Sequence, residues 1–340
     1  MASAEIWSAN SKPSSPGCSR NRRRPSSLLS SPIDPTRIPV VFVHGTASSV
    51  GRWGDMVNDL FDDPRIRDRY QFWFFTYDTG NPVLYSALLL REALRDAVHK
   101  LDPAGKDPAL SEMVVIGHSQ GGLLAKALVV DNGDRVWSAI AYRPFDQVDL
   151  APEERDLLRR AVFIKPWPNV RRVVFIATPH RGSYLTEYPL AELVGRFITL
   201  PIRVVRTAAD LARDSSDFKF DPSDLGSGSL FGMTPNNPVV QTMADTPIAP
   251  GVHAHSIIAV AGNGPVEGSS DGVVKYSSSH LDGVDSEYIV RSGHSVQSNP
   301  YAIEEVRRIL LLHAADACTR MACGNLSLPP PTGMQAMMLR

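Results

Sequence analysis

Three side chains that can together drive nucleophilic attack on an acyl carbon stand in separate loops of this 340-residue chain. Ser119 lies in the pentad GHSQG at residues 117–121, Asp271 lies in the segment SSDG, and His294 follows Ser-Gly. A serine hydroxyl is a weak nucleophile at neutral pH unless a neighbouring base takes its proton, and histidine is the commonest base. An aspartate holds the histidine tautomer and stabilises the imidazolium. These residue types therefore predict a Ser119–His294–Asp271 triad.

The pentad around Ser119 fits the G-x-S-x-G pattern of a strand-to-helix turn that exposes a nucleophile. Residues 113–116 are apolar and predict a buried strand, and residues 120 to about 130 predict an apolar helix. Gly117 and Gly121 leave room for a sharp turn because neither carries a Cβ. The helix then points its N-terminal amides at Ser119, where negative charge develops during acyl transfer.

Two backbone amides are predicted to form an oxyanion hole. One belongs to Gln120, the residue after the nucleophile. The other comes from the loop HGTASS that follows a β-branched, apolar run at residues 38–43, and Thr46 is the best placed residue in that loop. The same segment could instead be a plain glycine turn after an edge strand.

The two partners of Ser119 each follow a predicted strand. Asp271 lies after residues 255–261, and His294 lies after residues 288–291. The carboxyl ends of parallel strands meet at one edge of a sheet, where open α/β sheets place their ligands. Three other acidic residues remain as alternatives to Asp271, namely Glu267, Asp282 and Asp285.

Three further histidines are predicted to contact substrate: His44, His118 and His180. His44 ends the strand before the Thr46 loop, and His118 precedes the nucleophile. His180 follows the predicted strand at residues 171–177 and so lies at the same sheet edge. It is not assigned as the base, because no acid follows it in the expected chain order.

Strand and helix patterns alternate from residue 38 to residue 130, which favours a mostly parallel sheet with helices on both faces. The net charge of −1 gives no indication of a nucleic-acid partner. No apolar run is long enough to cross a membrane, and residues 1–35 lack the apolar core of a secretory signal. We therefore expect a cytoplasmic protein, or an exported one if the true N-terminus differs. The three cysteines show no metal-ligand spacing, so no metal is predicted.

Five segments give the chain a resemblance to serine hydrolases of the α/β-hydrolase fold, in particular to bacterial lipases and PGAP-like serine esterases. They are VHG at 43–45, GHSQGG at 117–122, ATPHRGS at 177–183, SDGVV at 270–274 and SGH at 292–294. The resemblance covers roughly residues 36–315. It implies an α/β-hydrolase fold, hydrolysis of a small-molecule or lipid carboxylic ester, and no organic cofactor. An acyltransferase with the same triad is the first alternative, and a non-catalytic binding protein of the same fold is the second.

The expected organisation is a disordered tail at residues 1–35, a catalytic domain at 36–315 and a flexible C-terminal tail at 316–340. Two excursions interrupt the domain, at about 134–168 and 184–241. The second includes an apolar, helix-like piece at 190–211. Long insertions of this kind form either a cap or lid over a site or a structural cover of the core. The sequence leaves this choice, the acyl chain length, the alcohol group and the oligomeric state open.

Overall fold

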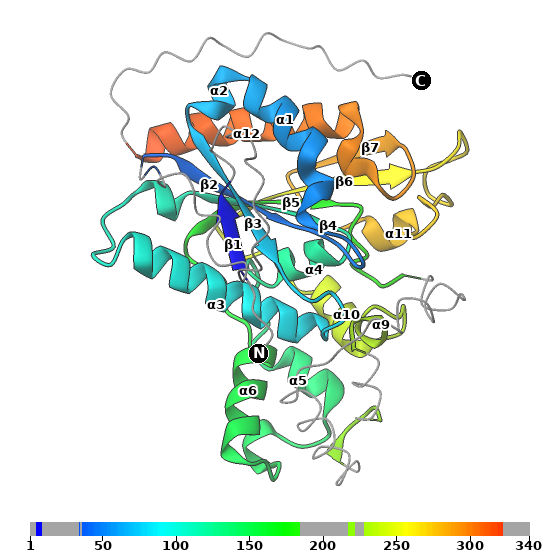
Figure 1. Cartoon of the computed structure of the whole chain (residues 1–340). Coiled ribbons are helices and arrows are strands. Elements are labelled where there is room, and N and C mark those ends of the chain that lie inside the picture. The colour runs from blue at the N-terminus through cyan, green and yellow to red at the C-terminus, as the bar shows by residue number, and fades with distance from the viewer. Residues whose placement is uncertain (1–4, 9–33, 35, 184–216, 222–227, 322–340) are drawn as a thin grey trace, which may run out of the picture.

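A seven-stranded sheet forms the centre of the computed structural model, which describes residues 5–8, 34, 36–183, 217–221 and 228–321 (Figure 1). The strand order is β1-β3-β2-β4-β5-β6-β7. All neighbouring pairs from β3 to β7 are parallel, and β1 pairs antiparallel with β3 at one edge. The strands are β1 (Glu5–Ser8), β2 (Ile38–Val43), β3 (Tyr70–Thr76), β4 (Met113–His118), β5 (Val170–Ile176), β6 (His253–Val260) and β7 (Ser286–Arg291).

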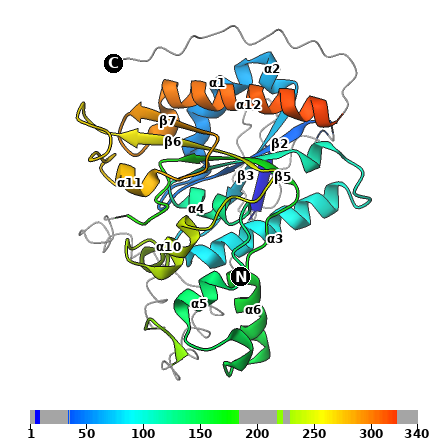
Figure 2. The same cartoon turned by 180° about the vertical axis from the view of Figure 1, so that it is seen from behind.

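Helices cover both faces of this sheet (Figures 1 and 2). The helices α1, α2 and α12 lie on one face, and α3 and α4 lie on the other. Beyond α3, farther from the sheet, lie α5 and α6. The described helices are α1 (Gly54–Asp62), α2 (Pro64–Arg67), α3 (Val83–Leu101), α4 (Gln120–Lys126), α5 (Arg135–Ile140), α6 (Pro152–Val162), α9 (Gly228–Gly232), α10 (Pro238–Ala244), α11 (Tyr276–Ser279) and α12 (Pro300–Arg320).

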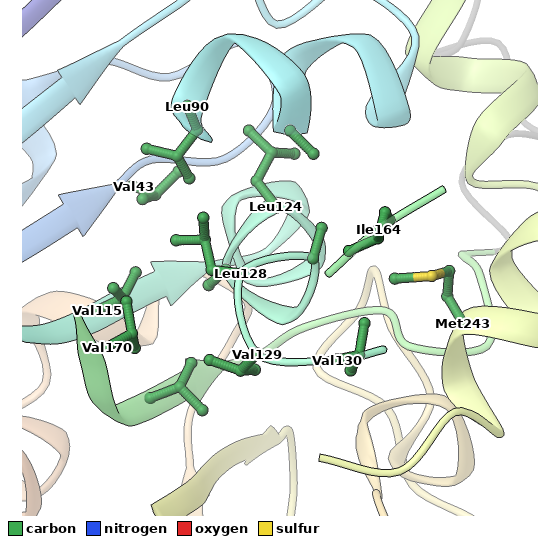
Figure 3. Close-up of a cluster of buried hydrophobic side chains, with 14 of the residues drawn as sticks. Val43, Leu90, Val115, Leu124, Leu128, Val129, Val130, Ile164, Val170 and Met243 are labelled. Atoms are coloured by element: carbon green, nitrogen blue, oxygen red, sulfur yellow. The ribbon is translucent and has the colours of Figure 1, made fainter. Parts of the chain in front are cut away.

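The central strands are buried on both sides, which explains why they are continuous apolar runs rather than alternating ones. On the α3 and α4 side, Leu90 of α3 and Leu124 of α4 pack with Val43 and Val115 of the sheet (Figure 3). A second buried cluster fills the opposite face beneath α1 and α12. These two layers fix the position of α4, and with it the turn that precedes the helix.

Several helices begin where an asparagine or aspartate precedes a proline. Asn299 accepts a hydrogen bond from Tyr301 N–H at the start of α12, and Asn237 accepts from Val239 N–H at the start of α10. A capping side chain satisfies one of the free amides of the first turn, and proline loses nothing at that position. Asp63 caps α2 in the same way.

The fold confirms the predicted mostly parallel sheet with helices on both faces. Some boundaries differ from those expected. Residues 5–8, assigned to a tail, form the edge strand β1, and α12 continues to Arg320, into the segment assigned to the C-terminal tail. The excursion at 134–168 contains α5 and α6 and no strand. The helix expected at 190–211 lies outside the described residues, so the cap or lid stays a prediction.

Every helix in the described part of the chain is too short or too polar to pass through a lipid bilayer.

Candidate active site

Ser119 lies in the sharp turn between β4 and α4. Its backbone angles are φ 54° and ψ −126°, a region that residues with a Cβ rarely adopt. The turn is held by hydrogen bonds from Ser119 N–H to the Ile176 carbonyl and from Gly122 N–H to the Ser119 carbonyl, both 2.9 Å long. The strand before the turn and the helix after it therefore hold Ser119 in this strained conformation, as expected for a nucleophile elbow.

The glycine at 121 allows the elbow to lie against the neighbouring strand. A Cβ on Gly121 would collide with the carbonyl groups of Val43 and His44 at the end of β2. Gly117 has the same role on the strand side, where a Cβ would collide with the backbone of Gly121 and Gly122. The close approach brings the loop after β2 next to the nucleophile.

His294 lies between Ser119 and Asp271. Its Nε2 is 2.9 Å from Ser119 Oγ, and its Nδ1 is 2.7 Å from Asp271 Oδ2. The carboxylate requires the ring proton on Nδ1, which leaves the Nε2 lone pair facing the serine hydroxyl. The structure thus brings together the three residues predicted to form the triad, from loops after β4, β6 and β7.

Asp271 is fixed by its own loop. Its Oδ1 accepts hydrogen bonds from Val273 N–H at 2.8 Å and from Val274 N–H at 2.7 Å, and its side chain is 1% exposed. These two hydrogen bonds hold the carboxyl group in one orientation. The carboxyl group is therefore fixed next to the imidazole of His294.

The two residues predicted for the oxyanion hole are joined by their side chains. Thr46 Oγ1 donates a hydrogen bond of 2.7 Å to Gln120 Oε1, and Gln120 Nε2 donates to the Thr79 carbonyl. Gln120 is the first residue of α4, so its N–H is one of the amides that a helix leaves without an internal acceptor. This bridge fixes the loop after β2 relative to the start of α4.

His118 supports the loop that carries His294. Its Nε2–H donates a hydrogen bond of 2.8 Å to the His294 carbonyl. Burial, followed by the nearby charge of His294, lowers the pKa of His118 to about 3. His118 is therefore neutral at ordinary pH and adds no positive charge beside the imidazole of His294.

Neither of the other two predicted histidines forms a hydrogen bond with a triad residue in the described part of the chain, and their contact with substrate stays a prediction. His44 is buried, stacks on the Tyr77 ring at 4.8 Å, and has a pKa lowered by burial. Tyr77 O–H donates to the His44 carbonyl at 2.9 Å, so His44 belongs to the packing beneath the loop. His180 is buried beside Phe175 and lines an apolar cavity next to α4.

The alternative acids lie elsewhere. Asp285 bonds His253 Nδ1 at 3.0 Å and Ala254 N–H at 2.7 Å, and Asp282 Oδ1 lies 3.3 Å from His280 Nε2. Glu267 lies in the loop before Asp271. Among these acids, Asp271 is the one bonded to His294.

One neighbour of the triad was not predicted from the sequence. Arg52, which precedes α1, donates through Nη2 to Ser295 Oγ at 2.8 Å, next to His294 in the chain. A single arginine before a helix is common in proteins and carries no recognisable signal. Its guanidinium places a positive charge beside the loop that holds His294.

Residues 34–139 match the family model described as "PGAP1-like alpha/beta domain". A GPI inositol-deacylase B of Yarrowia lipolytica (strain CLIB 122 / E 150) is 26% identical over 115 residues, which are 29% of this chain and 12% of that protein. The match thus spans about an eighth of the length of the curated relative. The family-model match begins just before β2 and ends within α5, so it includes the turn that carries Ser119.

Several solved structures are similar in arrangement. The mature lipase BlEst2 of Bacillus licheniformis aligns with a TM-score of 0.47 and 15% identity, over 84% of this chain and 96% of that one. The product of the gene lin2722 of Listeria innocua aligns with a TM-score of 0.43 and 14% identity, over 81% and 94%. The strand order and the elbow of this chain are themselves those of an α/β-hydrolase fold.

Proposed function

We propose that this chain is a serine hydrolase that cleaves carboxylic esters through an acyl-Ser119 intermediate. The observation that carries the proposal is the continuous line of hydrogen bonds from Ser119 Oγ to His294 and on to Asp271, at the carboxyl edge of the sheet. The strained backbone of Ser119 supports it, because such strain concentrates at functional sites.

The first half of the reaction forms the acyl-enzyme. His294 Nε2 takes the proton of Ser119 Oγ as the oxygen attacks the ester carbonyl carbon. The carbonyl oxygen becomes an oxyanion, which the amides of Thr46 and Gln120 stabilise. The ester C–O bond then breaks, and the imidazolium of His294 returns the proton to the leaving alkoxide. Asp271 stabilises the imidazolium while it exists.

The second half of the reaction releases the acid. Water enters where the alcohol left, His294 removes one of its protons, and the hydroxide oxygen attacks the acyl carbon. The bond to Ser119 Oγ breaks, and Ser119 regains its proton from His294. The neutral state of His118 helps here, since a second charged imidazole would oppose the protonation of His294.

The substrate class that we propose is an acyl ester of an alcohol. The curated relative is named as a deacylase. A serine–histidine–aspartate triad supports deacylation of an ester. No organic cofactor takes part in these steps. The same acyl-enzyme could pass its acyl group to an alcohol instead of water, which would make the chain an acyltransferase.

Hydrolysis of p-nitrophenyl esters from acetyl to palmitoyl tests the proposal, with the Ser119→Ala protein as the blank. We expect turnover in the native protein and none above background in the variant, because the alanine has no nucleophile. A fluorophosphonate probe applied to both proteins reports the reactive serine directly. Failure to label the folded native protein at Ser119 contradicts the proposal, and labelling without ester turnover favours the acyltransferase.

The assignment of the acid is tested by Asp271→Asn. The amide cannot hold the required tautomer of His294, so kcat should fall by roughly 10³- to 10⁴-fold. Asp282→Asn is the matched control, because Asp282 is exposed and bonds His280 rather than His294. The kcat of the control should equal that of the native protein. A near-native kcat for Asp271→Asn would move the acid to another residue.

A further inference from the structure

An apolar cavity lies beside α4, on the side where α3, α6 and α10 approach that helix. Its volume is about 150 Å³. Residues from all four helices line it, including Leu84, Leu123, Leu158, Val162, Val240 and Met243. A cavity of this volume holds a benzene-sized molecule. None of the three triad residues is among the residues that line the cavity in the described part of the chain.

One buried cation interrupts the apolar wall. Lys126, the last residue of α4, lines the cavity and is 1% exposed. Its Nζ donates one hydrogen bond of 2.8 Å, to the Ala244 carbonyl, while an ammonium carries three donors. Within the described residues, no carboxylate lies within ion-pair distance of Nζ. The pKa of Lys126 is lowered to about 7, mainly by burial and to a smaller extent by the charge of Arg181.

One buried imidazole lies in the same wall. His180 is 1% exposed, and neither of its ring nitrogens has a hydrogen-bond partner among the described residues. The ring contacts the Phe175 ring edge to face, with centroids 4.7 Å apart, which satisfies no nitrogen lone pair. Buried polar atoms without partners are costly, and a bound polar ligand is one way in which they are satisfied. Lys126 and His180 both line this one cavity.

We propose that this cavity is a binding site for an aliphatic monocarboxylate, with the carboxylate on Lys126 and His180 and the chain among the apolar side chains. Below about pH 7 Lys126 is mostly protonated, so Lys126 and Arg181 outweigh Asp245, the acidic residue that acts on Lys126, and the local charge favours an anion. A carboxylate offers acceptors to the spare donors of the ammonium and to an imidazole N–H. The apolar side chains of the cavity wall would contact the aliphatic chain of the ligand.

The cavity and the proposed nucleophile lie along the same face of α4. Ser119, Leu123 and Lys126 are spaced four and three residues apart, so they follow one stripe of the helix. Seven residues at the helical rise place Lys126 roughly 10 Å along the axis from Ser119. The proposal does not depend on catalysis, because the Ser119→Ala protein keeps the cavity unchanged.

The test uses hexanoate, hexan-1-ol and hexylammonium as probes of equal chain length, titrated into the full-length Ser119→Ala protein by calorimetry. Hexanoate should bind one per chain and at least about tenfold more tightly than hexan-1-ol, since charge-assisted hydrogen bonds exceed neutral ones by that order. Hexylammonium should bind most weakly. Equal affinity for hexanoate and hexan-1-ol overturns the proposal.

Three second-site variants locate the binding. Lys126→Met keeps the volume and removes the charge, so the preference for hexanoate over hexan-1-ol should disappear. Lys106→Met changes an exposed lysine outside the cavity and should leave the preference unchanged. Ala161→Leu fills part of the cavity, so it should weaken both ligands by about tenfold or more.

Two outcomes of these variants contradict the proposal. A hexanoate preference that persists in Lys126→Met places the carboxylate elsewhere, including at the proposed acylation site. Full hexanoate affinity in Ala161→Leu places the chain outside the cavity. If Lys126→Met does not fold, Lys126→Gln takes its place, because the amide keeps a donor for the Ala244 carbonyl and carries no charge. A hexanoate preference that persists in that variant has the same meaning.

Discussion

Ser119, the proposed nucleophile, adopts a backbone conformation that its own Cβ disfavours. A residue held at φ 54° with a Cβ costs of order 1–3 kcal/mol of folding free energy. The cost persists because β4 and α4 are both anchored in the core and leave the connecting turn no alternative. If Ser119 is the nucleophile, position 119 therefore loses some stability so that the hydroxyl can face His294.

The strain at position 119 predicts that Ser119→Gly stabilises the fold while abolishing hydrolysis. Glycine adopts positive φ without strain, although its unfolded state has more entropy, so the net gain in free energy of unfolding should be about 1 kcal/mol. Urea unfolding of Ser119→Gly and Ser119→Ala measures it. The alanine protein is the matched control, because it lacks the hydroxyl but keeps the Cβ. If glycine proves no more stable than alanine, the turn is not strained.

At the scale of the elements, the elbow depends on how closely α4 approaches β2. Gly121 touches the carbonyl groups at the end of β2, and a side chain there has nowhere to go. Gly54, the first residue of α1, is different, because beyond its chain neighbours and the backbone of its own helix no described atom lies within 4 Å of the place that a Cβ would occupy. A side chain at position 121 would therefore collide with the backbone, whereas a side chain at position 54 would not.

Replacing each glycine by alanine separates packing from backbone entropy. Gly121→Ala should lower the free energy of unfolding by about 1–3 kcal/mol and should displace the loop after β2, which carries Thr46, so ester turnover should fall as well. Gly54→Ala should raise the free energy of unfolding by up to about 1 kcal/mol. Urea unfolding and p-nitrophenyl ester turnover are measured on both proteins. Equal stability of the two variants would show that α4 can move away from β2.

The elements also show what the sequence could predict. Buried parallel strands are continuous apolar runs, so residues 38–43 and 113–116 were recognisable without a structure. Asp271 and His294 were recognisable because each follows such a run in the expected order. The edge strand β1 was missed because it is held by backbone pairing to β3, which requires no apolar pattern.

The cavity beside α4 was not predictable for a different reason. A lysine in an apolar helix is normally assigned to solvent, since lysine is almost never fully buried. Lys126 is buried because α10, more than a hundred positions later in the chain, supplies the Ala244 carbonyl as its acceptor. Such long-range pairing leaves no local signal in the sequence.

At the scale of the whole molecule, a buried polar network joins α12 to the sheet at the edge opposite the triad. Arg172 of β5 donates to His313 Nδ1 of α12 at 3.3 Å, to His255 Nε2 of β6, and to Asp316 at 2.6 Å. His313 Nε2–H donates in turn to the Glu112 carbonyl at 2.7 Å. Both histidines accept from the guanidinium, so both must be neutral in the folded protein.

This network predicts that the folded protein loses stability in acid at pH values well above those at which carboxylates titrate. Burial lowers the pKa of His313 to about 3 and that of His255 to about 4, against 6.5 when unfolded. Below pH 6.5 the unfolded chain binds protons that the folded chain does not, so stability falls as the pH falls. Between pH 6.5 and 4 each histidine should remove up to about 1.4 kcal/mol per pH unit. His118 acts in the same direction.

Urea unfolding at pH 7.5, 6.5, 5.5 and 4.5 measures this slope, and His313→Gln assigns it. A glutamine oxygen can accept from Arg172 but does not titrate, so the slope of the variant between pH 6.5 and 4.5 should be shallower by about the contribution of one histidine. His99→Gln is the control, because His99 is exposed on α3 and outside the network. An unchanged slope in His313→Gln would mean that α12 separates from the sheet before His313 is protonated, and that the network does not limit stability in acid.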